Sequence, residues 1–240
     1  MSSNGMSRYE PATPCYVVDA GLIENNLKVL REVMEHTGAC ILLAQKAFSM
    51  YALYPLIGQY LCGATASGLY EARLCAEEMS KPLKACGRKI ESHIFSPGYR
   101  EEDFQEILEY CDHIVFNSWR QVEKFGVRAR DAGKSIGLRI NPECSTQEGH
   151  AIYDPCAPGS RLGVTRECFA QGAKELLQML DGLHFHTLCE QDSDALEKTL
   201  NAVEDRFGQY LPGMKWINFG GGHHITRAGY DIPRLERCIR

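Results

Sequence analysis

The chain has 240 residues, of which 44% are hydrophobic and 24% are charged, and its formal net charge is −5. This composition is typical of a soluble globular protein and provides for one large α/β domain or two small ones. Lys and Arg are scattered along the chain, so nucleic acid is not an expected partner. There is no apolar run as long as a membrane span, and segment 1–10 has no apolar signal core, so we expect a cytoplasmic protein outside the membrane.

The eleven cysteines are odd in number and contain no Cys-x-x-Cys pair. The missing pair argues against a structural zinc site, and we expect no metal site. Several cysteines have apolar neighbours in the sequence, among them Cys40, Cys62 and Cys189. We therefore predict reduced, buried thiols rather than disulfides.

Short apolar runs alternate with amphipathic segments from the start of the chain. Residues 15–19 (CYVVD) predict a short strand, and the following segment predicts a helix that is capped by Asp19 and ended by Gly38. The apolar run 39–44 (ACILLA) predicts a strand buried on both faces, and it ends just before Gln45 and Lys46.

Six further strands are predicted near residues 62–66, 92–96, 113–116, 136–140, 182–188 and 215–220. Helical segments lie between them, for example 67–79, 100–110 and 192–207. This alternation predicts a parallel sheet with helices outside it. A closed barrel needs eight strands, whereas seven are predicted from residue 39 onward, and an open doubly wound sheet is the alternative. Segment 141–161 is the longest predicted loop, of a length that is usually functional or mobile.

Lys46 directly follows the first buried strand, in LLAQKAF. The C-terminal ends of the strands face the active site in parallel barrels. A lysine with apolar neighbours can lose its proton and form a Schiff base with an aldehyde. An ordinary surface lysine is the alternative.

The glycine run 220–222 follows the last predicted strand. Three glycines let the backbone approach a phosphate with its amide N–H groups pointing inward. Phosphate sites of barrels often lie in the loops after the late strands. A plain turn would produce the same sequence pattern.

Two histidines and an arginine lie on other predicted strands. His184 and His186 alternate along 182–188 and should share one face of the strand. They suit stacking on a flat cofactor ring, hydrogen bonding in a core, or metal binding together with His223 or His224. Arg139 ends the strand 136–140, where a buried guanidinium would orient a cofactor or carboxylate, or form an internal ion pair.

Seven segments together resemble carboxynorspermidine decarboxylase, also called carboxyspermidine decarboxylase: TPCYVVD, LLAQKAF, TASGLYEARL, GLRINPECS, SRLGV, GLHFHTLCE and INFGGGHHIT. This enzyme is similar to the alanine-racemase-like (fold type III) decarboxylases that use pyridoxal 5'-phosphate (PLP), such as ornithine and diaminopimelate decarboxylases. The resemblance extends from Pro14 to about Asp231. FHTLCE and FGGGHH are typical of the polyamine branch, whereas a lysine after the first strand is shared by the wider group.

The resemblance implies a PLP-binding (β/α)8 barrel of the TIM type, with Lys46 as the Schiff-base lysine and His186 stacked on the pyridine ring. Both residues would be catalytic. The residues that it assigns to cofactor binding are Lys46, Ser67, Arg139, His186, Gly220, Gly221 and Gly222. The reaction would be the loss of CO2 from a carboxylated triamine, with the cofactor as electron sink, to give norspermidine or spermidine in polyamine biosynthesis. The family also implies a homodimer.

Members of the family are longer than this chain. Their second, β-rich domain and the acidic residue that faces the pyridine nitrogen would lie beyond Arg240. We therefore expect residues 1–240 to form an incomplete barrel domain without the last strand, with exposed sheet edges and negligible decarboxylase activity when isolated. A single-barrel PLP-binding regulatory protein is the alternative function, and a barrel enzyme that uses histidines for a metal is another.

Overall fold

The computed structural model describes residues 11–147 and 154–240. The strands are β1 (Leu42–Ala44), β2 (Gly63–Ala66), β3 (Glu91–Phe95), β4 (His113–Phe116), β5 (Ser135–Arg139), β6 (Gly182–His184) and β7 (Trp216–Asn218). The α-helices are α1 (Ala20–Thr37), α2 (Tyr54–Ile57), α3 (Leu69–Cys75), α4 (Lys81–Ala85), α5 (Glu101–Tyr110), α6 (Trp119–Asp131), α7 (Arg166–Ala170), α8 (Lys174–Leu177), α9 (Ser193–Phe207) and α10 (Ile232–Ile239). Short helical turns are η1 (Tyr51–Leu53), η2 (Ala76–Ser80), which is π-helical and extends α3, and η4 (Gly208–Gly213).

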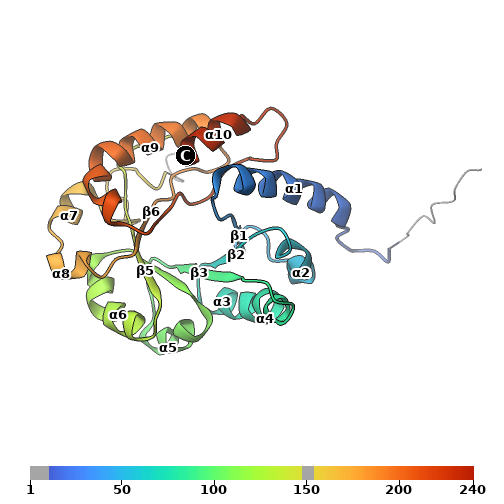
Figure 1. Cartoon of the computed structure of the whole chain (residues 1–240), viewed down its shortest axis with the longest axis horizontal. Helices are drawn as coiled ribbons and strands as arrows, with labels where there is room; N and C mark the ends of the chain where they lie inside the picture. The colour runs from blue at the N-terminus through green and yellow to red at the C-terminus, as the bar shows by residue number, and fades with distance from the viewer. Residues whose placement is uncertain (1–10, 148–153) are drawn as a thin grey trace, which may run out of the picture.

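All seven strands are parallel, and they lie in the sheet in chain order from β1 to β7. A doubly wound sheet reverses its strand order, so that alternative is excluded and the order is that of a (β/α) barrel. The helices lie around the outside of the curled sheet (Figure 1). α10 lies beside α1, where His36 Nδ1 is 2.7 Å from Glu236 Oε1. Within the described residues β1 and β7 are not paired, so the barrel is curled but open.

Helix α1 begins and ends where the sequence predicts. Asp19 Oδ1 accepts hydrogen bonds from the backbone N–H groups of Gly21 at 2.8 Å and Leu22 at 3.1 Å. Gly38 adopts the left-handed conformation with φ 74° and donates to the carbonyl of Met34 at 2.8 Å. No helix in the described ranges is both long enough and apolar enough to cross a membrane.

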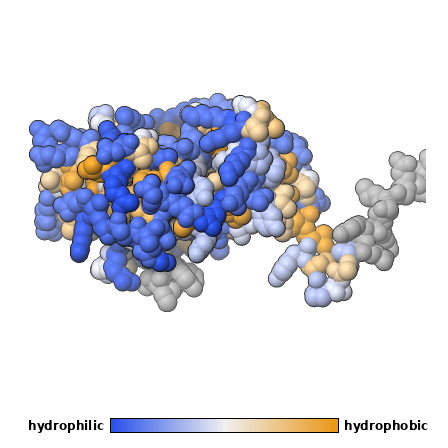
Figure 2. Space-filling view, turned by 90° about the horizontal axis from the view of Figure 1, so that it is seen from below, coloured by the Kyte–Doolittle hydropathy of each residue, from blue (hydrophilic) through white to orange (hydrophobic). Residues whose placement is uncertain are grey.

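The strand predicted at 15–19 is wrong. The segment is extended chain in which Tyr16 is 98% exposed and Val17 is 66% exposed. A strand requires a neighbouring strand for its backbone hydrogen bonds, and no described segment pairs with this one. Figure 2 shows a largely hydrophilic face, with apolar residues also visible where the chain leaves the body of the molecule.

All eleven cysteines are free, as predicted, but the prediction that they are mostly buried is wrong. Cys75 and Cys111 are buried, whereas Cys40 and Cys189 are exposed and Cys62 is half-buried. Cys40 and Cys62 lie just before β1 and β2, and Cys189 lies in the loop that follows β6. At such positions apolar neighbours in the sequence do not ensure burial, because the chain is entering or leaving the core.

Trp216 fills the inside of the curled sheet. Its Nε1 donates to Ser135 Oγ at 2.9 Å, across β6 to β5. A Cβ atom on Gly182 would lie 2.1 Å from Trp216 Cδ2, and one on Gly137 would lie 2.2 Å from Cη2. The absence of side chains at these two positions therefore makes room for the indole.

We predict that Gly182→Ala lowers the free energy of unfolding by about 1–3 kcal/mol, because its methyl group would overlap the indole of Trp216. Urea unfolding measures this change. Gly208→Ala is the matched control, since no atom lies within 4 Å of a Cβ there and φ is −52°. In a Trp216→Leu background most of the cost of Gly182→Ala should disappear, and an unchanged cost would contradict the close fit.

Candidate functional site

The residues predicted to carry chemistry lie at the C-terminal ends of five strands. They are Lys46 after β1, Ser67 after β2, Arg139 in β5, His184 and His186 in and after β6, and Gly220, Gly221 and Gly222 after β7. Because the strands are parallel, these ends lie at the same rim of the barrel. Ser67 is exposed, and its backbone N–H donates to Glu71 Oε2 at 2.6 Å, which places it at the periphery of this rim.

The turn that carries Lys46 is fixed by the residue before it. Gln45 is 1% exposed, and its backbone N–H donates to the carbonyl of Thr65 at 3.3 Å. Its side-chain Oε1 accepts from the hydroxyl of Tyr54 at 3.3 Å. Lys46 itself is exposed at the rim, and its positive charge contributes to lowering the pKa of His186. The lysine and this histidine are thus within electrostatic reach of each other.

His186 is held as a neutral ring. Its Nδ1 accepts from the backbone N–H of Gly221 at 3.3 Å, which puts the ring proton on Nε2. Burial lowers its pKa to about 3, and the positive charges of Lys46 and Arg139 add to this effect. A flat, uncharged ring therefore lies against the glycine run.

Arg139 is a buried cation, 6% exposed. Its Nη2 donates to the carbonyl of His186 at 3.0 Å, and its guanidinium lies 4.7 Å from the ring centroid of Phe95. Burial lowers its pKa to about 10. No ion pair of Arg139 is found among the residues that the structure describes, where its guanidinium donates to the carbonyl of His186. The guanidinium instead fixes the backbone of His186 and leaves positive charge at the rim.

Two of the three glycines are required by the packing of the backbone. Gly220 and Gly222 have φ of 73° and 90°. A Cβ on Gly220 would lie 2.5 Å from the carbonyl oxygen of Phe185, and one on Gly222 would lie 2.1 Å from that of Leu188. At Gly221 the nearest atom within 4 Å of a Cβ would be His186 Cε1 at 3.6 Å, so Gly221 faces open space.

His184 is a hydrogen-bonded core residue. Its Nδ1 lies 3.2 Å from the carbonyl oxygen of Asn218, and burial lowers its pKa well below the ordinary value. Its ring centroid is 6.2 Å from that of His186, consistent with a shared face. Within the described ranges, the cluster with the spacing of metal ligands contains neither of these histidines. A metal at this rim is therefore not supported.

Sequence reasoning missed Asn218 at the rim and the contact that His223 makes with Tyr230. Asn218 Oδ1 accepts from the backbone N–H of Gly220 at 2.8 Å and so shapes the start of the glycine run. An asparagine two residues before a glycine run is a turn signal that would have found it. His223 lies 3.2 Å through Nδ1 from the hydroxyl of Tyr230, and burial lowers its pKa. It had been considered only as a metal ligand.

No family model matches the chain, but curated decarboxylases match most of it. It is 40% identical over 223 residues to a carboxynorspermidine/carboxyspermidine decarboxylase of Campylobacter jejuni, covering 93% of this chain and 54% of that protein. It is 39% identical over 220 residues to a carboxyaminopropylagmatine decarboxylase of Synechocystis, covering 92% of this chain and 54% of that protein. Over the part that it spans, this chain is similar to carboxynorspermidine/carboxyspermidine decarboxylases. It spans about half the length of the curated relatives that it matches.

Solved structures show the same similarity. Carboxynorspermidine decarboxylase from C. jejuni, complexed with norspermidine, matches with a TM-score of 0.83 and 38% identity over 95% of this chain and 56% of that chain. Diaminopimelate decarboxylase from Helicobacter pylori matches with a TM-score of 0.61 and 16% identity over 90% of this chain and 57% of that chain, which shows a shared fold only. The expected barrel of the decarboxylase type is thereby confirmed.

We predict that the ring of His186 stays neutral to pH 5 with its proton on Nε2, because burial lowers its pKa to about 3. Above the ordinary pKa of about 6.5 the titration of His186 does not change the free energy of unfolding. As the pH falls from there toward 3, the unfolded chain takes up the proton first, and the free energy of unfolding decreases by up to about 1.4 kcal/mol per pH unit. Imidazole ¹⁵N shifts recorded from pH 8 to 5 measure both the tautomer and the titration. Protonation near pH 6.5 would contradict the buried, neutral ring.

Proposed function

We propose that this chain carries the PLP site of an enzyme that decarboxylates carboxynorspermidine or carboxyspermidine to norspermidine or spermidine. One observation carries the proposal. Lys46, the neutral ring of His186 and the open glycine run lie at one rim in a chain that is 40% identical to a decarboxylase of that name. The proposal includes a homodimer, as the resemblance implies, and a cytoplasmic location, as the sequence analysis leads us to expect.

The rim has the charge and shape that PLP requires. Arg139 is buried without a carboxylate partner among the described residues, and Lys46 adds a second positive charge. Such a site favours an anion, and the phosphate of PLP is a dianion. Gly221 leaves open space where a phosphate would approach the backbone amides. The residues present therefore fit the cofactor.

Each residue has a separate role in this proposal. Gly220, Gly221 and Gly222 would lie against the phosphate, with Arg139 and Ser67 nearer the periphery. The N–H groups of Gly220 and Gly221 donate to Asn218 Oδ1 and His186 Nδ1, so each would exchange that partner for a phosphate oxygen. Lys46 would bond to the cofactor aldehyde, and His186 would lie flat on the pyridine ring. PLP, when bound, supplies the electron sink for the electrons that remain when CO2 leaves. Arg139 acts as a positioning residue, because it fixes the backbone of His186 through its carbonyl.

The substrate preference is open to a second candidate. The Synechocystis relative is named for carboxyaminopropylagmatine, and its identity of 39% is close to the 40% of the first relative. The experiment is to load the complete gene product with PLP and compare CO2 release from carboxynorspermidine, carboxyspermidine and carboxyaminopropylagmatine. We expect turnover of one of the first two to exceed that of the third. PLP binding without CO2 release from any of them would favour the regulatory alternative.

We predict that borohydride treatment of the PLP-loaded chain attaches the cofactor to Lys46, because its amine stands at the rim beside His186. Peptide mapping by mass spectrometry locates the modification. Lys46→Ala should abolish the modification. Lys28→Ala is the control, since this lysine lies on the outer helix α1, where it is paired with Glu24, and the modification should persist. Cofactor found on another lysine of the wild-type chain would contradict the assignment.

We predict that Gly221→Asp lowers the affinity for PLP about 10- to 100-fold, because it places a negative charge beside the phosphate. Fluorescence titration with PLP measures the affinity, and circular dichroism checks the fold. The control is Gly213→Asp, since a Cβ on Gly213 meets no atom within 4 Å and the residue precedes β7, at the opposite end of that strand. Equal affinities in both variants would remove the phosphate role of the glycine run.

A further inference from the structure

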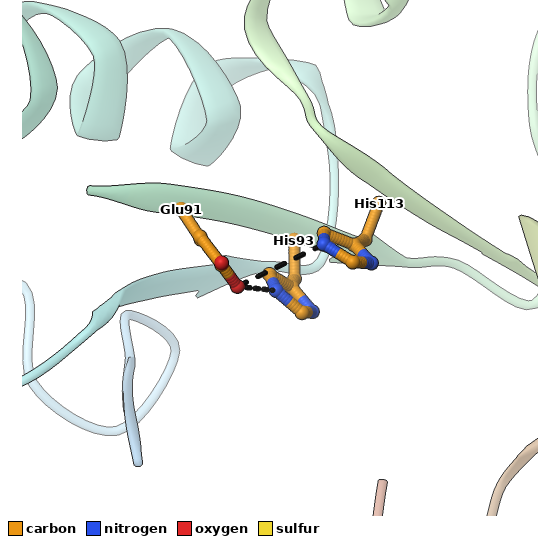
Figure 3. Close-up of side chains that lie close together, drawn as sticks. All are labelled: Glu91, His93 and His113. Carbon is orange, nitrogen blue, oxygen red and sulfur yellow. Dashed lines mark hydrogen bonds and ion pairs between the residues drawn. The ribbon is translucent and has the colours of Figure 1, made fainter. Parts of the chain in front are cut away.

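A second cluster of chemically active side chains lies at the opposite end of the barrel from Lys46. Glu91 begins β3 and His113 begins β4, so both are at the N-terminal ends of their strands, and His93 lies in the middle of β3. The register pairs His93 with His113. In Figure 3 the three side chains extend from the same side of the sheet and gather together. The buried residues between and after them, Ser92 and Ile94, point to the other side.

The distances within this cluster are those of metal ligands. Glu91 Oε2 lies 3.3 Å from His93 Nε2 and 3.7 Å from His113 Nε2, and the three ligand atoms lie within 4.8 Å of one another. Four tetrahedral ligands with bonds of about 2.1 Å to Zn²⁺ are roughly 3.4 Å apart. The two measured distances are close to this separation.

The ligand types also suit a cation. A carboxylate is ionised and an imidazole is largely neutral at pH 7, and both bind metals in these forms. Lys89 Nζ contacts the other carboxylate oxygen of Glu91, Oε1, at 3.3 Å, and leaves Oε2 to the histidines.

The cluster is incomplete as a hydrogen-bond network. The Nδ1 atoms of His93 and His113 are buried and have no hydrogen-bond partner among the described residues. The two rings are stacked with centroids 4.0 Å apart and an interplanar angle of 13°. Buried polar atoms without partners are costly, so they call for an explanation. A cation bound at the two Nε2 atoms would fix the proton of each ring on Nδ1, and each Nδ1–H would then need an acceptor such as water.

We propose that Glu91, His93 and His113 bind one divalent transition-metal ion, with Zn²⁺ as the best match and water as the fourth ligand. Two imidazoles and a carboxylate form a ligand set that Zn²⁺ prefers. The ion links β3 to β4 and stiffens the end of the barrel remote from the reaction. Binding turns the two rings out of their parallel stack, because their lone pairs must converge on the ion. This site is independent of the proposed decarboxylase activity.

The test is metal uptake by the tag-free chain after chelation and dialysis, measured by elemental analysis and by competition titration with Zn²⁺. We expect one equivalent of Zn²⁺ in the wild-type chain. His93→Gln and His113→Gln should each lower the affinity at least about tenfold. His36→Gln is the matched control, since His36 also contacts a glutamate, Glu236, but has no second histidine beside it, and it should bind as the wild type does.

A second readout reports the ring movement itself. The rings of Trp216 and His113 are steeply inclined at 73°, with centroids 5.7 Å apart, and Trp119 is the other of the two tryptophans in the chain. In a Trp119→Phe background Zn²⁺ should change the fluorescence of Trp216, and the melting temperature should rise by roughly 5 °C at saturating metal.

Absence of Zn²⁺ uptake by the wild-type chain would overturn the proposal, as would equal uptake by the wild type and both triad variants. If a triad variant fails to fold, the imidazole ¹⁵N signals of the wild-type chain decide. Zn²⁺ must shift the signals of His93 and His113 and leave that of His36 in place. Any other pattern contradicts the site.

Discussion

Parallel pairing in unbroken chain order is the constraint on which the rest of the structure depends. Each strand pairs with the next one along the chain, so every C-terminal end lies at one rim and every N-terminal end at the other. Residues as distant in sequence as Lys46 and Gly221 therefore lie at the same rim. The curl of the sheet requires an interior that is filled without crowding, and the indole of Trp216 against Gly137 and Gly182 meets this need.

The rim at the C-terminal ends of the strands combines positive charge with a neutral histidine ring. Arg139 uses a hydrogen bond to the carbonyl of His186 to fix the chain after β6, and its charge helps to keep that ring neutral. The glycine run approaches the same segment so closely that side chains at Gly220 and Gly222 would overlap its carbonyl groups. A neutral ring, two cations and an open stretch of backbone thus share one surface, which suits a flat, anionic ligand. The opposite rim holds Glu91 with two histidines and is chemically distinct.

Much of the fold was predictable because the sequence patterns that indicate its strands, helices and turns involve residues close together in the chain. The apolar run before Lys46, the capped helix after Asp19 and the glycine run each depend on neighbouring residues. The prediction at 15–19 was wrong because a strand depends on a partner, which a local pattern does not reveal. The burial of the cysteines was overestimated because apolar neighbours in the sequence do not reveal where the chain enters or leaves the core. The meeting of His93 with His113 depends on the register of β3 against β4, which the sequence of either strand alone does not determine.

We propose that one rim of this barrel binds the phosphate and the ring of PLP, and a crystal structure of the chain with PLP bound tests this proposal. We expect a phosphate within hydrogen-bond distance of the backbone amides of the glycine run 220–222, the pyridine ring against His186, and continuous density from Lys46 to the cofactor. A cofactor phosphate bound elsewhere, or a ring with no contact to His186, would contradict it.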